Sequence, residues 1–263
     1  MSISWLANNV KTKQSFFAAD FSSEVSRIKD DVKQSVGISE NTLIDFGHRV
    51  FAAISESSVA VKLNFSDFLM LPGSMKMLTE IIRAAKSCGL YVILKADGVC
   101  GELLPVLFGK RIKEYVFEPD ALEICMYCAD EDMILKLSKI YSKDIFITLN
   151  TEDIHSPVLY AEHVKKYMDS ENTGLSILKN DSDRLCEIRE ILHDYMFLAQ
   201  GGEIDESIKN CFNSDGSGAI VSMPASRFIH SIQNFEHEAA LGTMKSAAAI
   251  NRRLFKKSRL IKL

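Results

Sequence analysis

The sequence predicts one fold class, an α/β protein built as a single (β/α)8 barrel. Eight short apolar runs recur along the chain, and each is followed by a longer amphipathic segment. This alternation is typical of βα units around a parallel sheet. Eight parallel strands with eight crossovers close into a barrel, and 263 residues is the usual size of one such barrel.

The expected strands are short runs rich in β-branched and aromatic residues, as buried parallel strands are. In chain order they cover residues 16–20, 59–63, 91–96, 121–127, 145–149, 174–178, 195–199 and 219–223.

The segments between these runs place apolar residues at helical spacing, with charged residues on the opposite side. Clear examples are residues 74–86, 132–141, 158–168 and 182–192. Two further helices are expected, one at residues 1–14 across the bottom of the barrel and one at residues 235–255 that closes it. The basic residues near the C-terminus are expected to form a solvated helix face, and any further role for them stays open. They are Arg252, Arg253, Lys256, Lys257, Arg259 and Lys262.

We expect a single domain over residues 1–263, because no linker-like segment divides the chain. The net charge of -4 and the pI of about 5.9 argue against non-specific binding of nucleic acid. No segment approaches the ~20 apolar residues of a membrane span, and the N-terminal residues lack a secretory signal pattern. The sequence therefore predicts a cytoplasmic protein that binds neither membranes nor nucleic acid.

The cysteines and histidines give no sign of a metal site or a cofactor. The six cysteines are expected to be small buried hydrophobes rather than a disulfide framework. Cys125 and Cys128 have the spacing of a metal or redox pair, but no second pair follows, and they end a strand-like run instead of opening a helix. His230 and His237 share a helix face without a third ligand. We therefore expect no bound metal and no cofactor.

Several segments resemble, in the same order, the orotidine monophosphate decarboxylase family. Residues 58–64 (SVAVKLN) and 89–97 (GLYVILKAD) are similar to the family's second and third strands, and residues 174–189 are similar to its sixth βα unit. Residues 197–203 (FLAQGGE) resemble the Gln-Gly-Gly loop after strand seven, and residues 218–227 (GAIVSMPASR) resemble strand eight. The resemblance covers nearly the whole chain and implies the same barrel.

The resemblance implies a phosphate site made by Gln200, Gly201, Gly202 and Arg227. Barrels of this type commonly bind phosphate with the loops after strands seven and eight. Glycines let backbone N–H groups approach an anion, and a guanidinium can contact it through two hydrogen bonds. Taken alone, the two glycines could form an ordinary turn and Arg227 a surface ion pair. Ala199 joins Gln200 directly to the strand, so the loop that precedes Gln-Gly-Gly and holds the phosphate is expected to be shorter than in the family.

The resemblance also assigns substrate-binding positions. Asp20 falls where the family contacts the ribose, Lys62 on the lysine of the active-site network, and Asn150 and Thr151 where the family contacts the pyrimidine. A buried carboxylate and a buried ammonium are unfavourable unless paired, so Asp20 and Lys62 are expected to share one polar pocket. In the alternative, both simply reach solvent at strand ends.

The third strand departs from the family's Asp-x-Lys-x-x-Asp pattern. This chain has Lys95, Asp97 and Cys100 at the three positions, so lysine and the first aspartate are exchanged. The resemblance assigns the family's lysine to protonating the carbanion left after CO2 departs. Moving that ammonium by two strand residues shifts its Cα by roughly 6 to 7 Å, and a misplacement of about 1 Å can already lower a rate on the order of 100-fold. The motif is therefore expected to be inactive in the parent reaction.

Three functions follow from these observations. The first is a diverged barrel that binds a nucleoside monophosphate or sugar phosphate and acts as a carbon–carbon lyase of altered reaction, with Lys62, Lys95 and Asp97 as catalytic residues. The second is a pseudoenzyme, an inactive binding or scaffold protein on the same barrel. The third is a working orotidylate decarboxylase with a relocated lysine. The sequence does not identify the natural ligand. Homodimer formation also stays open, because Cys100 replaces the residue that reaches the neighbouring subunit in the family.

Overall fold

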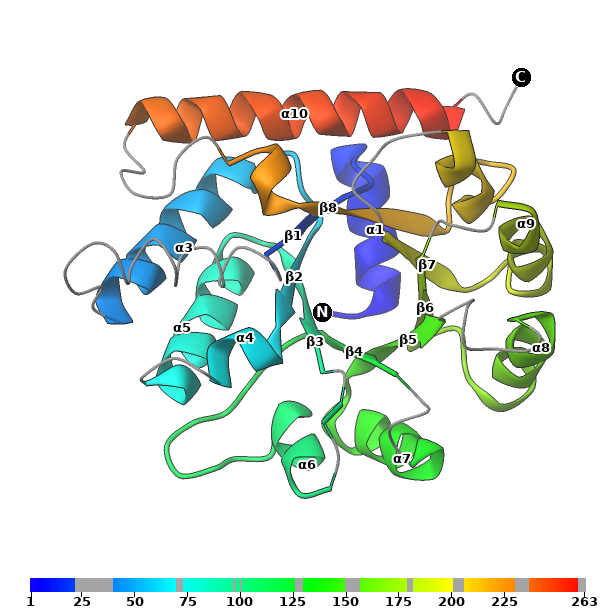
Figure 1. Cartoon of the computed structure of the whole chain (residues 1–263), viewed down its shortest axis with the longest axis horizontal. Coiled ribbons are helices and arrows are strands. Elements are labelled where there is room, and N and C mark those ends of the chain that lie inside the picture. The colour runs from blue at the N-terminus through cyan, green and yellow to red at the C-terminus, as the bar shows by residue number, and fades with distance from the viewer. Residues whose placement is uncertain are drawn as a thin grey trace.

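A computed structural model confirms the expected barrel. Eight parallel strands pair in chain order, and the last strand pairs with the first, so that the sheet is closed. The helices surround the sheet (Figure 1). The structure describes residues 1–21, 40–69, 73–96, 98–99, 101–125, 130–149, 157–178, 182–200, 206–229 and 237–259.

Each expected apolar run overlaps one strand of the barrel, and for all but the fourth run the ends differ by no more than one residue. The strands are β1 (Phe17–Asp20), β2 (Ala60–Asn64), β3 (Tyr91–Lys95), β4 (Ala121–Ile124), β5 (Asp144–Leu149), β6 (Thr173–Leu178), β7 (Met196–Gln200) and β8 (Ala219–Pro224). For the fourth run, residues 126–127 lie outside the described residues, and β4 ends before them.

The expected helices are also present, including those outside the βα units. Among the described residues the α-helices are α1 (Ile3–Lys13), α3 (Glu40–Ile54), α4 (Phe65–Leu69), α5 (Ser74–Ser87), α6 (Leu103–Leu107), α7 (Glu131–Tyr141), α8 (Pro157–Tyr167), α9 (Ser182–Ile191) and α10 (His237–Arg259). The 3-10 helices are η2 (Glu206–Cys211) and η3 (Ala225–Arg227).

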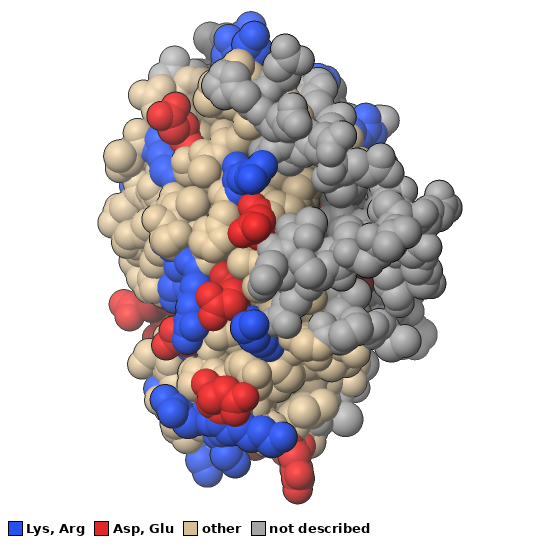
Figure 2. Space-filling view, turned by 90° about the vertical axis from the view of Figure 1, so that its left-hand side faces the viewer, with Lys and Arg blue, Asp and Glu red and all other residues tan. Residues whose placement is uncertain are grey.

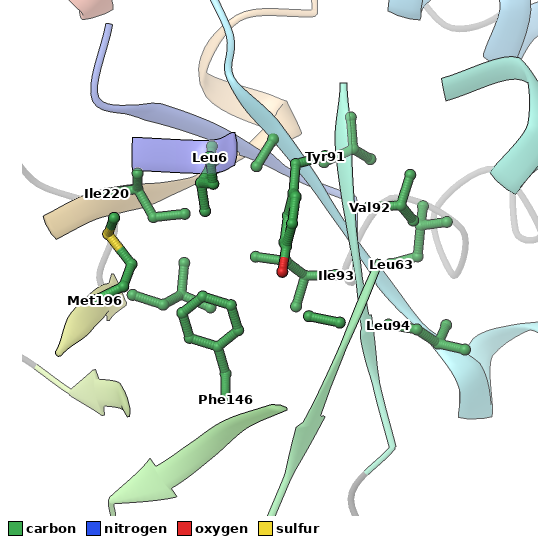
Figure 3. Packing of buried hydrophobic residues seen from close by; sticks show 14 of the residues in the cluster. Leu6, Leu63, Tyr91, Val92, Ile93, Leu94, Phe146, Met196 and Ile220 are labelled. Carbon is green, nitrogen blue, oxygen red and sulfur yellow. The ribbon is translucent and has the colours of Figure 1, made fainter. Parts of the chain in front are cut away.

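The N-terminal half of the barrel interior is a packed apolar core. Tyr91 and Ile93 of β3 point inward toward Phe146, whereas Val92 and Leu94 point the opposite way, toward the helices (Figure 3). This is the alternation that a strand buried on both faces requires. All of these side chains are fully buried. The lower barrel is therefore filled rather than open.

Gly174 on β6 is needed for this packing. A Cβ at this position would lie 2.6 Å from the carbonyl oxygen of Met196 and 2.6 Å from Cε1 of Phe146. Neither neighbour can move without disturbing the strand or the core. The apolar run of β6 therefore begins with the one residue type that leaves room for the Phe146 ring.

Helix α1 covers the N-terminal end of the barrel, as expected from the sequence (Figure 1). The Ser2 side chain caps it by accepting a hydrogen bond from the Trp5 backbone N–H at 3.2 Å. The Trp5 ring stacks on Tyr91 with centroids 6.5 Å apart, and Leu6 is fully buried. The amino group of Met1 forms an ion pair with Asp120 at 2.8 Å. Helix α1 is thus held by packing and by charge.

Asp144, buried beneath α1, makes stability depend on pH. Its Oδ2 accepts a hydrogen bond of 2.5 Å from the Tyr91 hydroxyl. Burial raises the pKa of Asp144 to about 6, against the hydrogen bonds from Tyr91 and the Ile3 backbone and the charge of the Met1 amino group. A raised carboxyl pKa means that the stability it contributes is complete below about pH 4 and is lost as pH rises through about 6.

We therefore expect wild type to lose about 3 kcal/mol relative to Asp144→Asn between pH 4 and pH 6.5, because a pKa difference of about two units corresponds to that free energy. Urea unfolding of both proteins across this range measures the difference, and the shared pH dependence of the other carboxylates cancels. A difference between the two proteins that stays constant with pH would contradict this assignment.

Arg189 on α9 is a buried cation that ties α9 to the lower ends of β7 and β8. Its two terminal nitrogens donate to the carbonyl oxygens of Leu192 (3.1 Å), His193 (3.5 Å), Tyr195 (2.9 Å), Cys211 (2.8 Å) and Gly218 (2.9 Å). The guanidinium also lies over the Phe197 ring, 3.2 Å from its centroid. Burial lowers the pKa of Arg189 to about 9. The residue is only 6% exposed, so protein carbonyl groups rather than water surround the guanidinium.

The described surface carries charges of both signs. Figure 2 shows basic and acidic side chains interspersed on the face seen there. On α5, Arg83 and Glu80 form an ion pair of 2.7 Å. No helix of the described residues is long and apolar enough to span a membrane.

The expectation that the cysteines are buried holds for Cys211. It is wrong for Cys186, which is exposed because it lies on the outer side of α9.

Candidate functional site at the C-terminal mouth of the barrel

The upper half of the barrel interior is polar and charged. Lys62 of β2 and Glu123 of β4 form an ion pair with Nζ and Oε2 2.8 Å apart, and they are 1% and 0% exposed. Since β2 and β4 are not neighbours in the sheet, the two side chains can meet only inside the barrel. An ion pair buried to this degree is unfavourable unless further hydrogen bonds satisfy it.

Those further bonds come from β6 and β7. The hydroxyl of Ser176 donates to Oε1 of Glu123 at 2.8 Å, and the amide nitrogen of Gln200 donates to the same oxygen at 2.5 Å. The Gln200 amide also donates to Ser176 Oγ. Glu123 therefore connects side chains from three other strands.

Asp20 of β1 completes this cluster. Its Oδ2 lies 3.8 Å from Lys62 Nζ and accepts a hydrogen bond of 2.9 Å from Ser222 of β8.

Each even-numbered strand contributes one inward side chain to this cluster, as in the layers of four that fill barrels of this type. The layer consists of Lys62, Glu123, Ser176 and Ser222. A layer of this kind is normally apolar, so its polarity sets this end of the barrel apart from the apolar lower half.

Asp67, on the short helix α4 after β2, adds a carboxyl group at the mouth. The side-chain amide of Asn64 donates to its Oδ1 at 3.2 Å, while its buried Oδ2 has no hydrogen-bond partner among the described residues. Burial and the nearby Asp20 carboxylate raise the pKa of Asp67 to about 6, although the Asn64 hydrogen bond and the charge of Lys95 act against this shift. The charges of Lys95 and Asp20 therefore act in opposite directions on the pKa of Asp67.

Of the residues expected to bind phosphate, Arg227 lies in the segment after β8. Arg227 ends η3, directly after β8, and is exposed at the same end of the barrel as the charged layer. Its side chain is exposed, whereas that of Lys62 is buried. Gly201 and Gly202 lie outside the described residues.

No protein-family model matches the sequence, and no curated protein matches it. Solved structures do match. The OMP decarboxylase of Leishmania donovani has a TM-score of 0.70 at 17% identity, over 97% of this chain and 99% of that one. The putative orotidine-monophosphate-decarboxylase of Toxoplasma gondii has a TM-score of 0.73 at 16% identity, over 97% and 96%.

This chain has the fold of the orotidine monophosphate decarboxylases. A third match, the putative orotidine 5'-phosphate decarboxylase of Streptomyces avermitilis, gives a TM-score of 0.68 at 14% identity over 96% of this chain and 94% of that one. A putative fructose-1,6-biphosphate aldolase of Coccidioides immitis gives 0.54 at 12% identity, over 95% and 93%. The orotidine monophosphate decarboxylase fold confirms the resemblance in the sequence.

Lys62 has carboxylates from two strands as partners. Only Asp20 of β1 was expected from the sequence, and it lies 3.8 Å away, whereas Glu123 of β4 lies closer, at 2.8 Å. Glu123 is the residue that lies opposite Lys95 in the β3–β4 pairing.

The structure brings three of the expected site residues together, namely Asp20, Lys62 and Gln200. Lys95 lies at the end of β3, on the inward side that Tyr91 and Ile93 share. Other expected positions lie outside the described residues. They are Asp97, Cys100, Asn150, Thr151, Gly201 and Gly202.

Sequence reasoning missed four residues of the cluster, and three of them carried a visible signal. Glu123, Ser176 and Ser222 are single polar residues inside apolar strand runs, a placement that favours an inward polar contact over solvent. Asp67 had no such signal, because an acidic residue in a first helical turn is ordinary. Within the described part of the chain, no group of three His, Cys, Asp or Glu residues could hold a metal ion.

Proposed function

We propose that this protein binds a nucleoside monophosphate or sugar phosphate at the C-terminal mouth of the barrel. The observation that carries the proposal is the change of the barrel interior from an apolar core to a charged layer at one end. A layer of buried charges contributes little to stability compared with apolar packing. Its position at the mouth, where (β/α)8 barrels bind their ligands, supports a binding role instead.

In this proposal the exposed Arg227, with Gly201 and Gly202, holds the phosphoryl group. Asp20 and Asn64 face the sugar side of the mouth, and Lys62 supplies positive charge from below. The reaction proposed for this site is a carbon–carbon lyase step that differs from orotidylate decarboxylation, with Lys62, Lys95 and Asp97 as the acid–base groups.

A binding protein without catalysis is the second candidate, and one contact favours it. Lys62 is buried and paired with Glu123 at 2.8 Å, so its ammonium is committed within the protein. A group that must deliver a proton needs access to the reacting atom. Binding measurements together with a product assay on candidate phosphate esters separate the two candidates.

Arg227→Ala is expected to weaken binding of uridine monophosphate by roughly 10- to 150-fold, or about 1.5 to 3 kcal/mol, because a charge-assisted contact to the phosphate is lost. Isothermal titration calorimetry on both proteins measures the change. Arg252→Ala, which removes an exposed arginine from α10, is the matched control and should bind as wild type does. Equal affinity of wild type and Arg227→Ala would place the anion elsewhere.

A further inference from the structure

Asp67 is a carboxyl group at the mouth with one oxygen that the protein leaves unsatisfied. Its Oδ1 accepts a hydrogen bond of 3.2 Å from the Asn64 amide, whereas its Oδ2 is buried and has no hydrogen-bond partner among the described residues. Burial of an ionised oxygen without a partner is unfavourable. A proton on Oδ2 removes the charge and leaves the hydrogen bond from Asn64 to Oδ1 in place.

The other two carboxylates described at this end have partners that favour their charged forms. Glu123 pairs with Lys62 at 2.8 Å and accepts two further hydrogen bonds. Asp20 accepts a hydrogen bond of 2.9 Å from Ser222 and lies 3.8 Å from Lys62. Hydrogen bonds and a nearby ammonium both stabilise an ionised carboxyl group. Among these three groups, Asp67 is therefore the one suited to hold a proton.

The charges around Asp67 place it between its two forms near neutral pH. Burial raises its pKa to about 6, Asp20 of β1 adds to this rise, and Lys95 of β3 acts against it. Helix α5 also packs against α4, and its buried residues are all uncharged. One more negative charge at the mouth would therefore shift Asp67 toward the protonated form.

A bound phosphate ester would supply that negative charge. Charges interact more strongly where water is excluded, and Oδ2 of Asp67 is shielded from water. An anion at the mouth thus favours the protonated form of Asp67 through its charge, without the need for a direct contact. Because coupling between two binding events is reciprocal, the proton strengthens anion binding by the same factor.

We propose that Asp67 takes up a proton from solution when the mouth of the barrel binds an anionic ligand, so that proton and ligand bind cooperatively and acidification strengthens binding. The inference rests on the proposed function, because it requires a ligand at this site. The step transfers one proton from solvent to Oδ2 and changes no covalent bond of the ligand. Asp67 then acts as a pH sensor of the site.

The variant that tests the proposal is Asp67→Asn, which has a neutral side chain of nearly the same shape at every pH. Wild type and the variant are titrated calorimetrically with uridine monophosphate between pH 5 and pH 8. The phosphate of the ligand itself titrates near pH 6, but this effect is common to both proteins and cancels in the ratio of their affinities. The ratio therefore reports on Asp67.

The two proteins are expected to bind almost equally at pH 5, and Asp67→Asn is expected to bind about 10-fold more tightly than wild type at pH 8. A rise of about one unit in the pKa of Asp67 on binding corresponds to this change. Asp144→Asn is the matched control, because Asp144 also has a pKa of about 6 but lies at the opposite end of the barrel. Its affinity ratio to wild type should not vary with pH.

Carbon-13 NMR of the side-chain carboxyl groups separates the possible failures. In the free protein the Asp67 signal should titrate with a midpoint near pH 6, and saturation with uridine monophosphate should raise that midpoint while the Asp144 midpoint stays unchanged. A free midpoint near the ordinary value of about 4 overturns the inference. Binding that leaves the Asp67 midpoint unmoved overturns it too, while the proposed function stands. If neither uridine monophosphate nor inorganic phosphate binds, the proposed function fails and the inference falls with it.

Discussion

Arg189→Ala is expected to lower the free energy of unfolding by about 4 kcal/mol, among the largest effects of any single change in this chain. The variant removes the Arg189 donors from the carbonyl oxygens of Tyr195, Cys211 and Gly218, and it removes the cation from the face of Phe197. For a domain of this size the loss corresponds to a fall in Tm of about 8 to 16 °C. Calorimetry or thermal circular dichroism measures it.

The matched control is Arg83→Ala on α5. Arg83 is 57% exposed and pairs only with its helix neighbour Glu80 in the contacts described above, so its loss should change stability by no more than about 0.5 kcal/mol. Arg189→Lys should fall between the two, because an ammonium cannot reach several carbonyls at once as a planar guanidinium does. If Arg189→Ala were as stable as Arg83→Ala, the carbonyl cluster would not hold α9 in place.

Wild type is expected to release CO2 from orotidine monophosphate at a rate lower by at least about 10⁴-fold than a working family enzyme in the same assay. In the sequence resemblance Lys95 falls at the position of the family's first aspartate, and Lys62 pairs with Glu123 at 2.8 Å. Neither ammonium is therefore placed as the family's proton donor is. A coupled CO2-release assay gives the rate directly.

The companion protein for that assay carries Lys95→Asp, Asp97→Lys and Cys100→Asp, which restore the family order. It should regain measurable activity only if the segment around Gln200 still permits the phosphate to be held. Rapid turnover by wild type would show that Lys62 or a reoriented Lys95 delivers the proton. In that case the motif exchange would not have ended the parent reaction.

The fold was predictable from the sequence because it depends on local patterns. Each strand is an apolar run long enough to cross the sheet, and alternation of such runs with amphipathic segments leaves few topologies other than the barrel. Gly174 illustrates the limit of this reasoning. The run that contains Gly174 predicts a strand, but the need for glycine at this position arises from the ring of Phe146 on the neighbouring strand β5.

The site was only partly predictable, because its contacts join positions far apart in the chain. Gln200 and Glu123 are separated by 77 positions, and which inward residues meet depends on the tilt and stagger of the strands, which spacing does not reveal. The family resemblance located Asp20, Lys62 and Gln200, and pairing of buried charges predicted the contact of Lys62 with Asp20, but nothing pointed to Glu123. Arg189 was equally hidden, since a charged residue on an amphipathic helix is normally expected to face solvent.

The division of the barrel interior into an apolar end and a charged end bears on how such a protein can change during evolution. Substitutions at well-separated positions act on stability almost independently. The packing of Tyr91, Phe146 and Gly174 below the charged layer can therefore hold the fold while residues at the mouth are exchanged. Charged side chains at the mouth, such as Lys62 and Glu123, can therefore differ between barrels that share the same apolar packing beneath them.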